Sequence, residues 1–183
     1  MTLFLDVTGH SSNLSHCPGL VGSLNTANNL LPSPFRKNLS TGGTVKYLVD
    51  SNIWLELLLN QQKASVVQCL FKTIPTAELA ISEFTVCSIG LILTRLNKPD
   101  VWRDFVTDVL ENGALSRIAL DPDGLRETTV ARQQFRLDFD DAYQYVVAQQ
   151  HNLVLISFDT DFDKTFLGRK SPEEILSSFA AHS

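Results

Sequence analysis

The chain has 183 residues, of which 44% are apolar, and a formal net charge of −5 at pH 7. This length suits one compact α/β domain and is too short for two of full size. The acidic balance excludes a basic protein that coats nucleic acid, because phosphate binding needs clustered Lys and Arg. It does not exclude an enzyme that holds divalent cations, because carboxylates build such sites.

The first segment of the chain, residues 1–44, is rich in Ser, Asn, Gly, Thr and Pro and has no sustained apolar period. This composition is typical of a segment that does not pack. We therefore expect residues 1–44 to be a disordered extension or a mis-called start, with Val45 as the true first residue. Residues 45–183 are then expected to form a single domain.

Signals for secretion or membrane insertion are missing from the sequence. The start has no basic leader, and the longest apolar run is too short to span a bilayer. We therefore expect a cytoplasmic protein that makes no membrane contact.

From Val45 onward, short β-branched runs alternate with longer segments of helical period, which is typical of a parallel α/β sheet. The predicted strands cover residues 45–49, 79–82, 115–120 and 153–158. The predicted helices cover residues 52–60, 62–73, 84–96, 100–111, 123–135, 140–150 and 173–180. The last helix has clear start signals, with Ser171 as its cap and Pro172 in its first turn.

Acidic residues recur at the carboxyl ends of the predicted strands: Asp50 after the first, Glu83 after the second, and Asp159 and Asp161 after the fourth. Two more acids, Asp140 and Asp141, open the helix before the fourth strand. Residues beyond the carboxyl ends of parallel strands converge on one crevice, so we expect these carboxylates to meet. They would repel one another without a cation, and oxygen ligands without Cys or His favour Mg²⁺ or Mn²⁺. The chemistry that this indicates is phosphodiester hydrolysis.

Each acid also has a purely structural explanation. Asp50 could cap a helix, Asp140 and Asp141 could complement a helix dipole, and Asp159 and Asp161 could be turn residues. Capping alone does not require acids to recur at strand ends, so their conjunction favours a metal site over these separate roles.

Four strings in the chain resemble a PIN domain: YLVDSNIWLELLL, AISEFTVCSIG, FDDAYQYVVAQQHNLVLISFDTDFDK and GRKSPEEIL. The resemblance covers residues 45 to about 178. This is the fold of the toxin nucleases of VapBC-type toxin-antitoxin pairs and of several RNA-processing nucleases. The resemblance implies a three-layer α/β/α fold with a central parallel sheet of about four strands. It also implies a Mg²⁺- or Mn²⁺-dependent endoribonuclease acting on RNA, a possible antitoxin partner and a homodimer.

The resemblance also assigns roles to single residues. It implies metal-binding roles for four acids: Asp50, Asp141, Asp159 and Asp161. The predicted catalytic acids are Asp50, Asp141, Asp159 and Glu83. Supporting roles are predicted for Asn52, Ser157 and Asp140. Two bases that follow the acids, Lys164 and Arg169, are predicted to contact the RNA backbone.

One departure from the family pattern concerns a missing glutamate. When the usual S-x-x-T-x-x-E pattern is aligned with Ser82 and Thr85, the position of its glutamate is occupied by Ser88. Glu83 lies about 7.5 Å earlier along the helix axis. It could still reach the crevice from the strand end, or it could only complement the helix dipole. Without its contribution, the alternative function is a catalytically depleted PIN fold that binds RNA or a protein partner.

Overall fold

The computed structural model describes residues 44–181. The prediction that residues 1–44 are a disordered extension or a mis-called start therefore concerns residues that, apart from residue 44, lie outside the described part of the chain. A four-stranded sheet forms the centre, in the order β3-β2-β1-β4, and all of its strand pairs are parallel. The strands are β1 (Tyr47–Val49), β2 (Leu79–Ser82), β3 (Ser116–Ile118) and β4 (Val154–Ile156). Each lies inside a predicted strand, so the predicted parallel α/β fold is confirmed.

Each of the predicted helices is present, with ends that shift by a few residues. The α-helices are α1 (Ser51–Leu58), α2 (Ala64–Thr73), α3 (Glu83–Arg95), α4 (Pro99–Phe105), α5 (Pro122–Phe135), α6 (Phe139–His151) and α7 (Pro172–Ala180). The helix predicted for 100–111 is α4 followed by a π-helical stretch, η3 (Val106–Glu111). Two short 3-10 helices were not predicted: η2 (Thr76–Glu78) and η4 (Thr160–Lys164).

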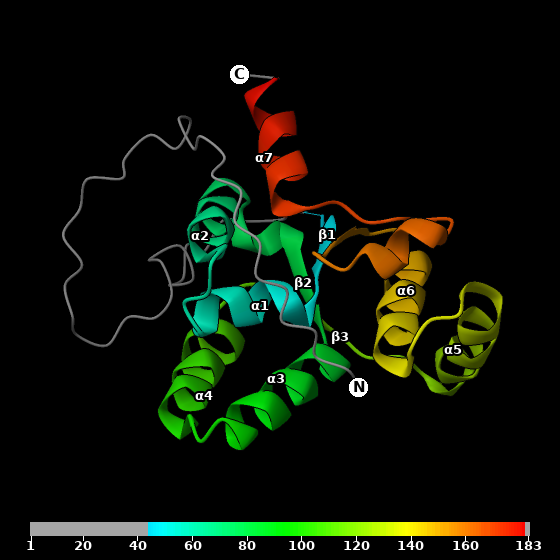
Figure 1. The fold of residues 1–183 in the computed structure, drawn as a ribbon, viewed down its shortest axis with the longest axis horizontal. Helices are drawn as coiled ribbons and strands as arrows, with labels where there is room; N and C mark the ends of the chain where they lie inside the picture. The colour runs from blue at the N-terminus through cyan, green and yellow to red at the C-terminus, as the bar shows by residue number, and fades with distance from the viewer. Residues whose placement is uncertain (1–43, 182–183) are drawn as a thin grey trace.

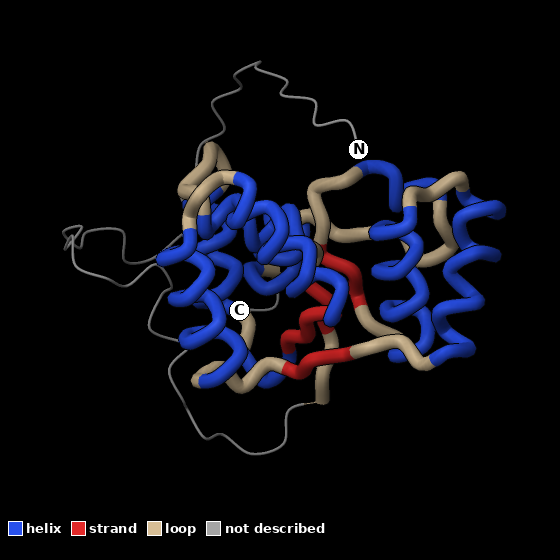
Figure 2. The backbone as a smooth tube through the Cα atoms, turned by 90° about the horizontal axis from the view of Figure 1, so that it is seen from below, coloured by secondary structure: helices blue, strands red, loops and turns tan. Residues whose placement is uncertain are grey.

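The helices cover the two faces of the sheet. Successive strand residues point to opposite faces, so Val49 joins the core shared with α1, α2, α3, α4 and α7, while Leu48 joins the core shared with α5 and α6. Figure 1 shows these two groups on either side of the strands, and Figure 2 shows the strands between them from below. The three-layer α/β/α arrangement is therefore confirmed.

A buried aromatic group fixes α1 behind the sheet. Trp54 is fully buried and stacks on Phe71 of α2, with ring centroids 4.7 Å apart. It also meets the edge of Phe105 at 5.7 Å. Because α1 starts directly after β1, this packing holds the residue at the junction, Asp50, in one place.

Turn chemistry fixes the segments around β4. Asn152 ends α6 with a φ of 52°, a left-handed conformation that Asn tolerates well, and the chain then enters β4. The predicted start of α7 is confirmed by a complete capping box between Ser171 and Glu174. In the part of the chain that the structure describes, no helix combines the length and hydropathy needed to cross a membrane.

Candidate active site

Asp50 lies at the carboxyl end of β1 and is only 5% exposed. Its Oδ1 accepts a hydrogen bond of 2.6 Å from the backbone N–H of Ser51, so it caps α1 as the structural explanation requires. This cap occupies one carboxylate oxygen and leaves the other for contacts across the sheet. The structural and functional explanations for Asp50 are therefore compatible.

The second oxygen of Asp50 joins the ends of β1 and β4. Oδ2 accepts hydrogen bonds from Ser157 Oγ at 2.7 Å and from Asn52 Nδ2 at 2.8 Å. Asn52 Nδ2 also donates to Ser157 Oγ at 2.9 Å, and its Oδ1 accepts from the N–H of Phe158 at 3.2 Å. Asn52 and Ser157 thus lie where the predicted supporting roles need them, and they hold Asp50 from two sides.

Burial raises the pKa of Asp50 above its ordinary value, because a charged carboxylate loses its hydration there. Hydrogen bonds from Ser157, Ser51 and Gln144 act in the opposite direction and partly offset this effect. Asp50 is therefore a buried carboxylate that is well supplied with donors.

Asp141 lies in the first turn of α6, half-buried, and its pKa is raised to about 8. Loss of hydration is the largest cause, followed by the negative charges of Asp140, Asp159, Asp50 and Asp161. The structure therefore brings the other four predicted acids within electrostatic reach of Asp141. Their catalytic and metal-binding roles remain predictions.

Asp159 and Asp161 form the rim of this acidic cluster. Asp159 caps η4 by accepting a hydrogen bond of 2.8 Å from the N–H of Asp161. Its own N–H donates to Ser157 Oγ at 2.9 Å, which ties the rim to the end of β4. Phe162 is fully buried beneath η4 and anchors this turn.

Glu83 is the predicted site residue that the structure does not join to the cluster. It begins α3 behind the Ser82 cap, and its Oε1 accepts hydrogen bonds from Arg117 of β3 at 2.5 and 3.0 Å. It is not among the groups that raise the pKa of Asp141. Ser88, at the family glutamate position, lies half-buried on α3.

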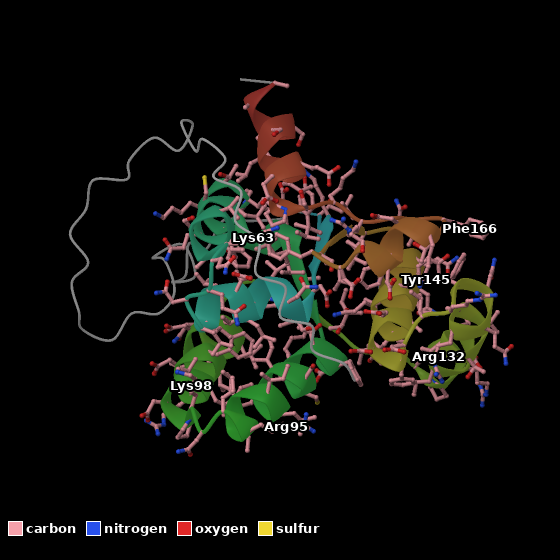
Figure 3. The ribbon with its side chains drawn as sticks, in the orientation of Figure 1. Lys63, Arg95, Lys98, Arg132, Tyr145 and Phe166 are labelled. Atoms are coloured by element: carbon pink, nitrogen blue, oxygen red, sulfur yellow. The ribbon has the colours of Figure 1, made fainter. Side chains whose placement is uncertain are left out.

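The two predicted RNA-contacting bases are held by protein groups. Lys164 Nζ lies 3.3 Å from Asp161 and donates to the backbone carbonyl of Arg136 at 3.3 Å. Arg169 pairs with Asp163 at 3.2 Å and donates to the backbone carbonyl of Ser157 at 3.1 Å. Both lie beside the acidic cluster. By contrast, the basic side chains labelled in Figure 3 are spread over both helical layers.

A buried amide was not predicted as part of this site. Gln144 on α6 is 2% exposed, and its Nε2 donates to Asp50 Oδ1 at 3.2 Å. The same nitrogen contacts the hydroxyl of Thr85, which in turn meets Ser82 Oγ at 3.0 Å. The one feature of the sequence that could have indicated this role is that Gln144 interrupts the otherwise apolar string AYQYVVA. It lies three residues after Asp141.

The donor chemistry of the cluster fits a hard divalent cation. Four carboxylates act on Asp141, and one of them, Asp161, is also paired with Lys164. Cys and His are not among these groups. Within residues 44–181, no three His, Cys, Asp or Glu side chains form a ready-made metal cage. Mg²⁺ does not require such a cage, because it usually keeps several waters and binds through one or two carboxylates.

A separate hollow of about 450 Å³ lies between α5 and α6. Its lining includes Phe135, Tyr145 and Phe166; Figure 3 labels the last two. The acids described above do not line it. This hollow is therefore distinct from the acidic cluster.

The fold and the cluster together define an α/β protein with a group of acidic residues near the carboxyl ends of its parallel strands. The chain belongs to the PIN domain family, whose profile matches residues 47–166. No curated protein matches the chain.

Solved structures share this fold over nearly their whole length. A chain of a toxin-antitoxin complex from Klebsiella pneumoniae is 25% identical, with a TM-score of 0.55, covering 69% of this chain and 98% of that one. A protein from Pyrobaculum aerophilum is 26% identical, with a TM-score of 0.56, covering 77% and 99%. VapC20 of Mycobacterium tuberculosis, described as a Sarcin-Ricin loop cleaving toxin, is 16% identical, with a TM-score of 0.58, covering 67% and 96%.

Proposed function

We propose that this protein is a divalent-metal-dependent endoribonuclease that hydrolyses RNA phosphodiester bonds at the acidic cluster. The observation that carries the proposal is the group of carboxylates acting on Asp141 beside the buried Asp50. Membership of the PIN domain family supports a nuclease, and the shared fold with VapC20, a Sarcin-Ricin loop cleaving toxin, supports RNA as the substrate.

In this proposal, Mg²⁺ or Mn²⁺ would bind through one or two of the carboxylates of Asp50, Asp141 and Asp159 and keep several waters, with Asp161 at the rim. When bound, such a cation activates a water and stabilises the charge that develops on the phosphate. Asn52 and Ser157 keep Asp50 oriented through their hydrogen bonds to Oδ2. The burial of Asp50 and the half-burial of Asp141 strengthen the electrostatic contacts of these two carboxylates.

We propose further that the enzyme is the toxin of a toxin-antitoxin pair, acting in the cytoplasm as a homodimer. The similar chain from the Klebsiella pneumoniae toxin-antitoxin complex supports an antitoxin partner. Lys164 and Arg169 would meet the RNA backbone, since both lie beside the cluster.

The competing function is a depleted PIN fold that binds RNA or a protein without cutting RNA. Two observations favour it: Glu83 is engaged by Arg117, and a serine occupies the family glutamate position. A measurement of metal affinity does not distinguish an active ribonuclease from a depleted PIN fold, but a measurement of RNA turnover does.

The test is cleavage of a mixed structured RNA by the purified full chain in Mn²⁺, with EDTA and Asp141→Asn as controls. Asp123→Asn is the matched control, because this carboxylate is 83% exposed on α5 and pairs only locally with Arg126. We expect cleavage by the parent and by Asp123→Asn, and none by Asp141→Asn or in EDTA. Absence of cleavage in every condition would support the binding module instead.

A further inference from the structure

Gln144 is a buried amide on the same helix as Asp141, one turn later, and it contacts Asp50 of the acidic cluster. A glutamine is seldom fully buried without a partner for each polar atom, because an unpaired polar atom in the interior costs free energy. Its position therefore calls for an explanation beyond filling space.

The donor side of Gln144 is fully engaged. Nε2 donates to Asp50 Oδ1 at 3.2 Å and also contacts the hydroxyl of Thr85 on α3. The other residues that donate to Asp50 are Ser51, Asn52 and Ser157, which come from the start of α1 and the end of β4. Gln144 is thus the link between Asp50 and the helix that carries Asp141.

The acceptor side of Gln144 is not engaged. Its Oε1 is buried and accepts no hydrogen bond from any residue in the range 44–181. An apolar side chain of the same length would remove this unpaired oxygen, but it would also deprive Asp50 and Thr85 of their contact with the amide. The amide is therefore explained by its bond to Asp50 rather than by filling space.

We propose that Gln144 is a positioning residue that fixes the carboxylate of Asp50 relative to Asp141 and thereby sets the geometry in which these acids hold a divalent cation. The inference rests on the proposed function, since it concerns the same acidic cluster. A neutral amide does this without adding a further negative charge to acids that already repel one another. Residues that orient metal ligands commonly contribute about 10- to 100-fold to metal affinity or activity.

The test compares the full-length parent with Gln144→Met, which keeps the chain length and removes both polar atoms. Gln149→Met is the matched control, because Gln149 is exposed on the same helix. The measurements are the Mn²⁺ dissociation constant by calorimetry, the RNA kcat and KM at saturating Mn²⁺, and the melting temperature without metal. For Gln144→Met we expect Mn²⁺ binding that is at least about tenfold weaker, a lower kcat, an unchanged KM and a melting temperature that falls no further than the loss of one buried hydrogen bond explains. Gln149→Met should match the parent throughout.

A second variant keeps the inference testable if Gln144→Met fails to fold. Gln144→Asn retains the amide but is one methylene too short to reach Asp50, so we expect the same loss of Mn²⁺ affinity. Parental Mn²⁺ affinity in a folded Gln144 variant would overturn the inference. A parent that binds Mn²⁺ without cleaving RNA would refute the proposed function alone, because Mn²⁺ binding still tests Gln144. A parent that binds no Mn²⁺ would overturn both.

Discussion

Because the pKa of Asp141 is raised, the stability of the metal-free protein should decrease as the pH rises from acidic to neutral. In the folded chain, Asp141 keeps its proton up to about pH 8, whereas its ordinary pKa is 3.8. Between these values the folded state binds a proton that the unfolded state has released, so stability falls as pH rises. The decline should end above about pH 8, where the folded state also loses the proton.

The size of this effect follows from the two pKa values. If solvent screening is ignored, the rise in the pKa of Asp141 from 3.8 to about 8 corresponds to a change of about 6 kcal/mol in the free energy of unfolding. Asp141 is only half-buried, and solvent screens the charges of its neighbours. We therefore expect the free energy of unfolding to fall by about 2 to 3 kcal/mol between pH 5 and pH 8. The variant Asp141→Asn has no carboxyl group to titrate at this position and should show a shallower decline, while Asp50, whose pKa burial also raises, keeps its own share.

The assay is urea unfolding in EDTA at pH 5, 6.5 and 8, for the parent and for Asp141→Asn. Saturating Mn²⁺ should reverse the trend for the parent, because metal binding favours the ionised carboxylates and releases protons. Equal stability of the metal-free parent at pH 5 and pH 8 would refute the reasoning. So would an equally steep decline in Asp141→Asn.

Three further substitutions and one comparison variant probe the site and the core. Ser157→Ala removes the 2.7 Å donor to Asp50, and we expect the free energy of unfolding in urea to drop by about 1 to 3 kcal/mol; an unchanged value would mean that this bond contributes nothing. Glu83→Gln breaks an ion pair whose side chains are 37% and 49% exposed, so stability should change by less than about 1 kcal/mol. Its RNA turnover should fall less than tenfold, or about 1.4 kcal/mol on the barrier, and a larger loss would place Glu83 in the catalytic site. Trp54→Ala removes a fully buried indole and should lower the free energy of unfolding by about 3 to 5 kcal/mol, whereas the half-buried Trp102→Ala should cost clearly less.

The features that could be predicted from the sequence are those that depend on local pattern. β-branched runs marked the strands, and helical periods marked the α-helices, because these periods reflect which side chains face the sheet. The position of Asp50 at a strand end followed from the same pattern. The start of α7 was readable because Ser171, Pro172 and Glu174 act within one turn.

The features that could not be predicted depend on contacts between distant parts of the chain. The hydrogen bond from Gln144 to Asp50 spans 94 positions, and a lone glutamine in an apolar helix does not indicate its partner. The pairing of Glu83 with Arg117 depends on how β3 lies beside β2, which one sequence does not fix. Without that register, whether Glu83 faced the other acids could not be decided.

The pairing of β1 with β4 has a consequence for protein synthesis. Asp50 and Ser157 are 107 positions apart, and β4 is further joined to Lys170 by a bridge at Ile156. During synthesis, Asp50 therefore leaves the ribosome well before the partners that complete the cluster. A nascent chain cannot assemble its acidic cluster until the residues of β4 and the strand bridge have also emerged. Under the proposed function, each molecule stays inactive toward RNA until that point of its synthesis.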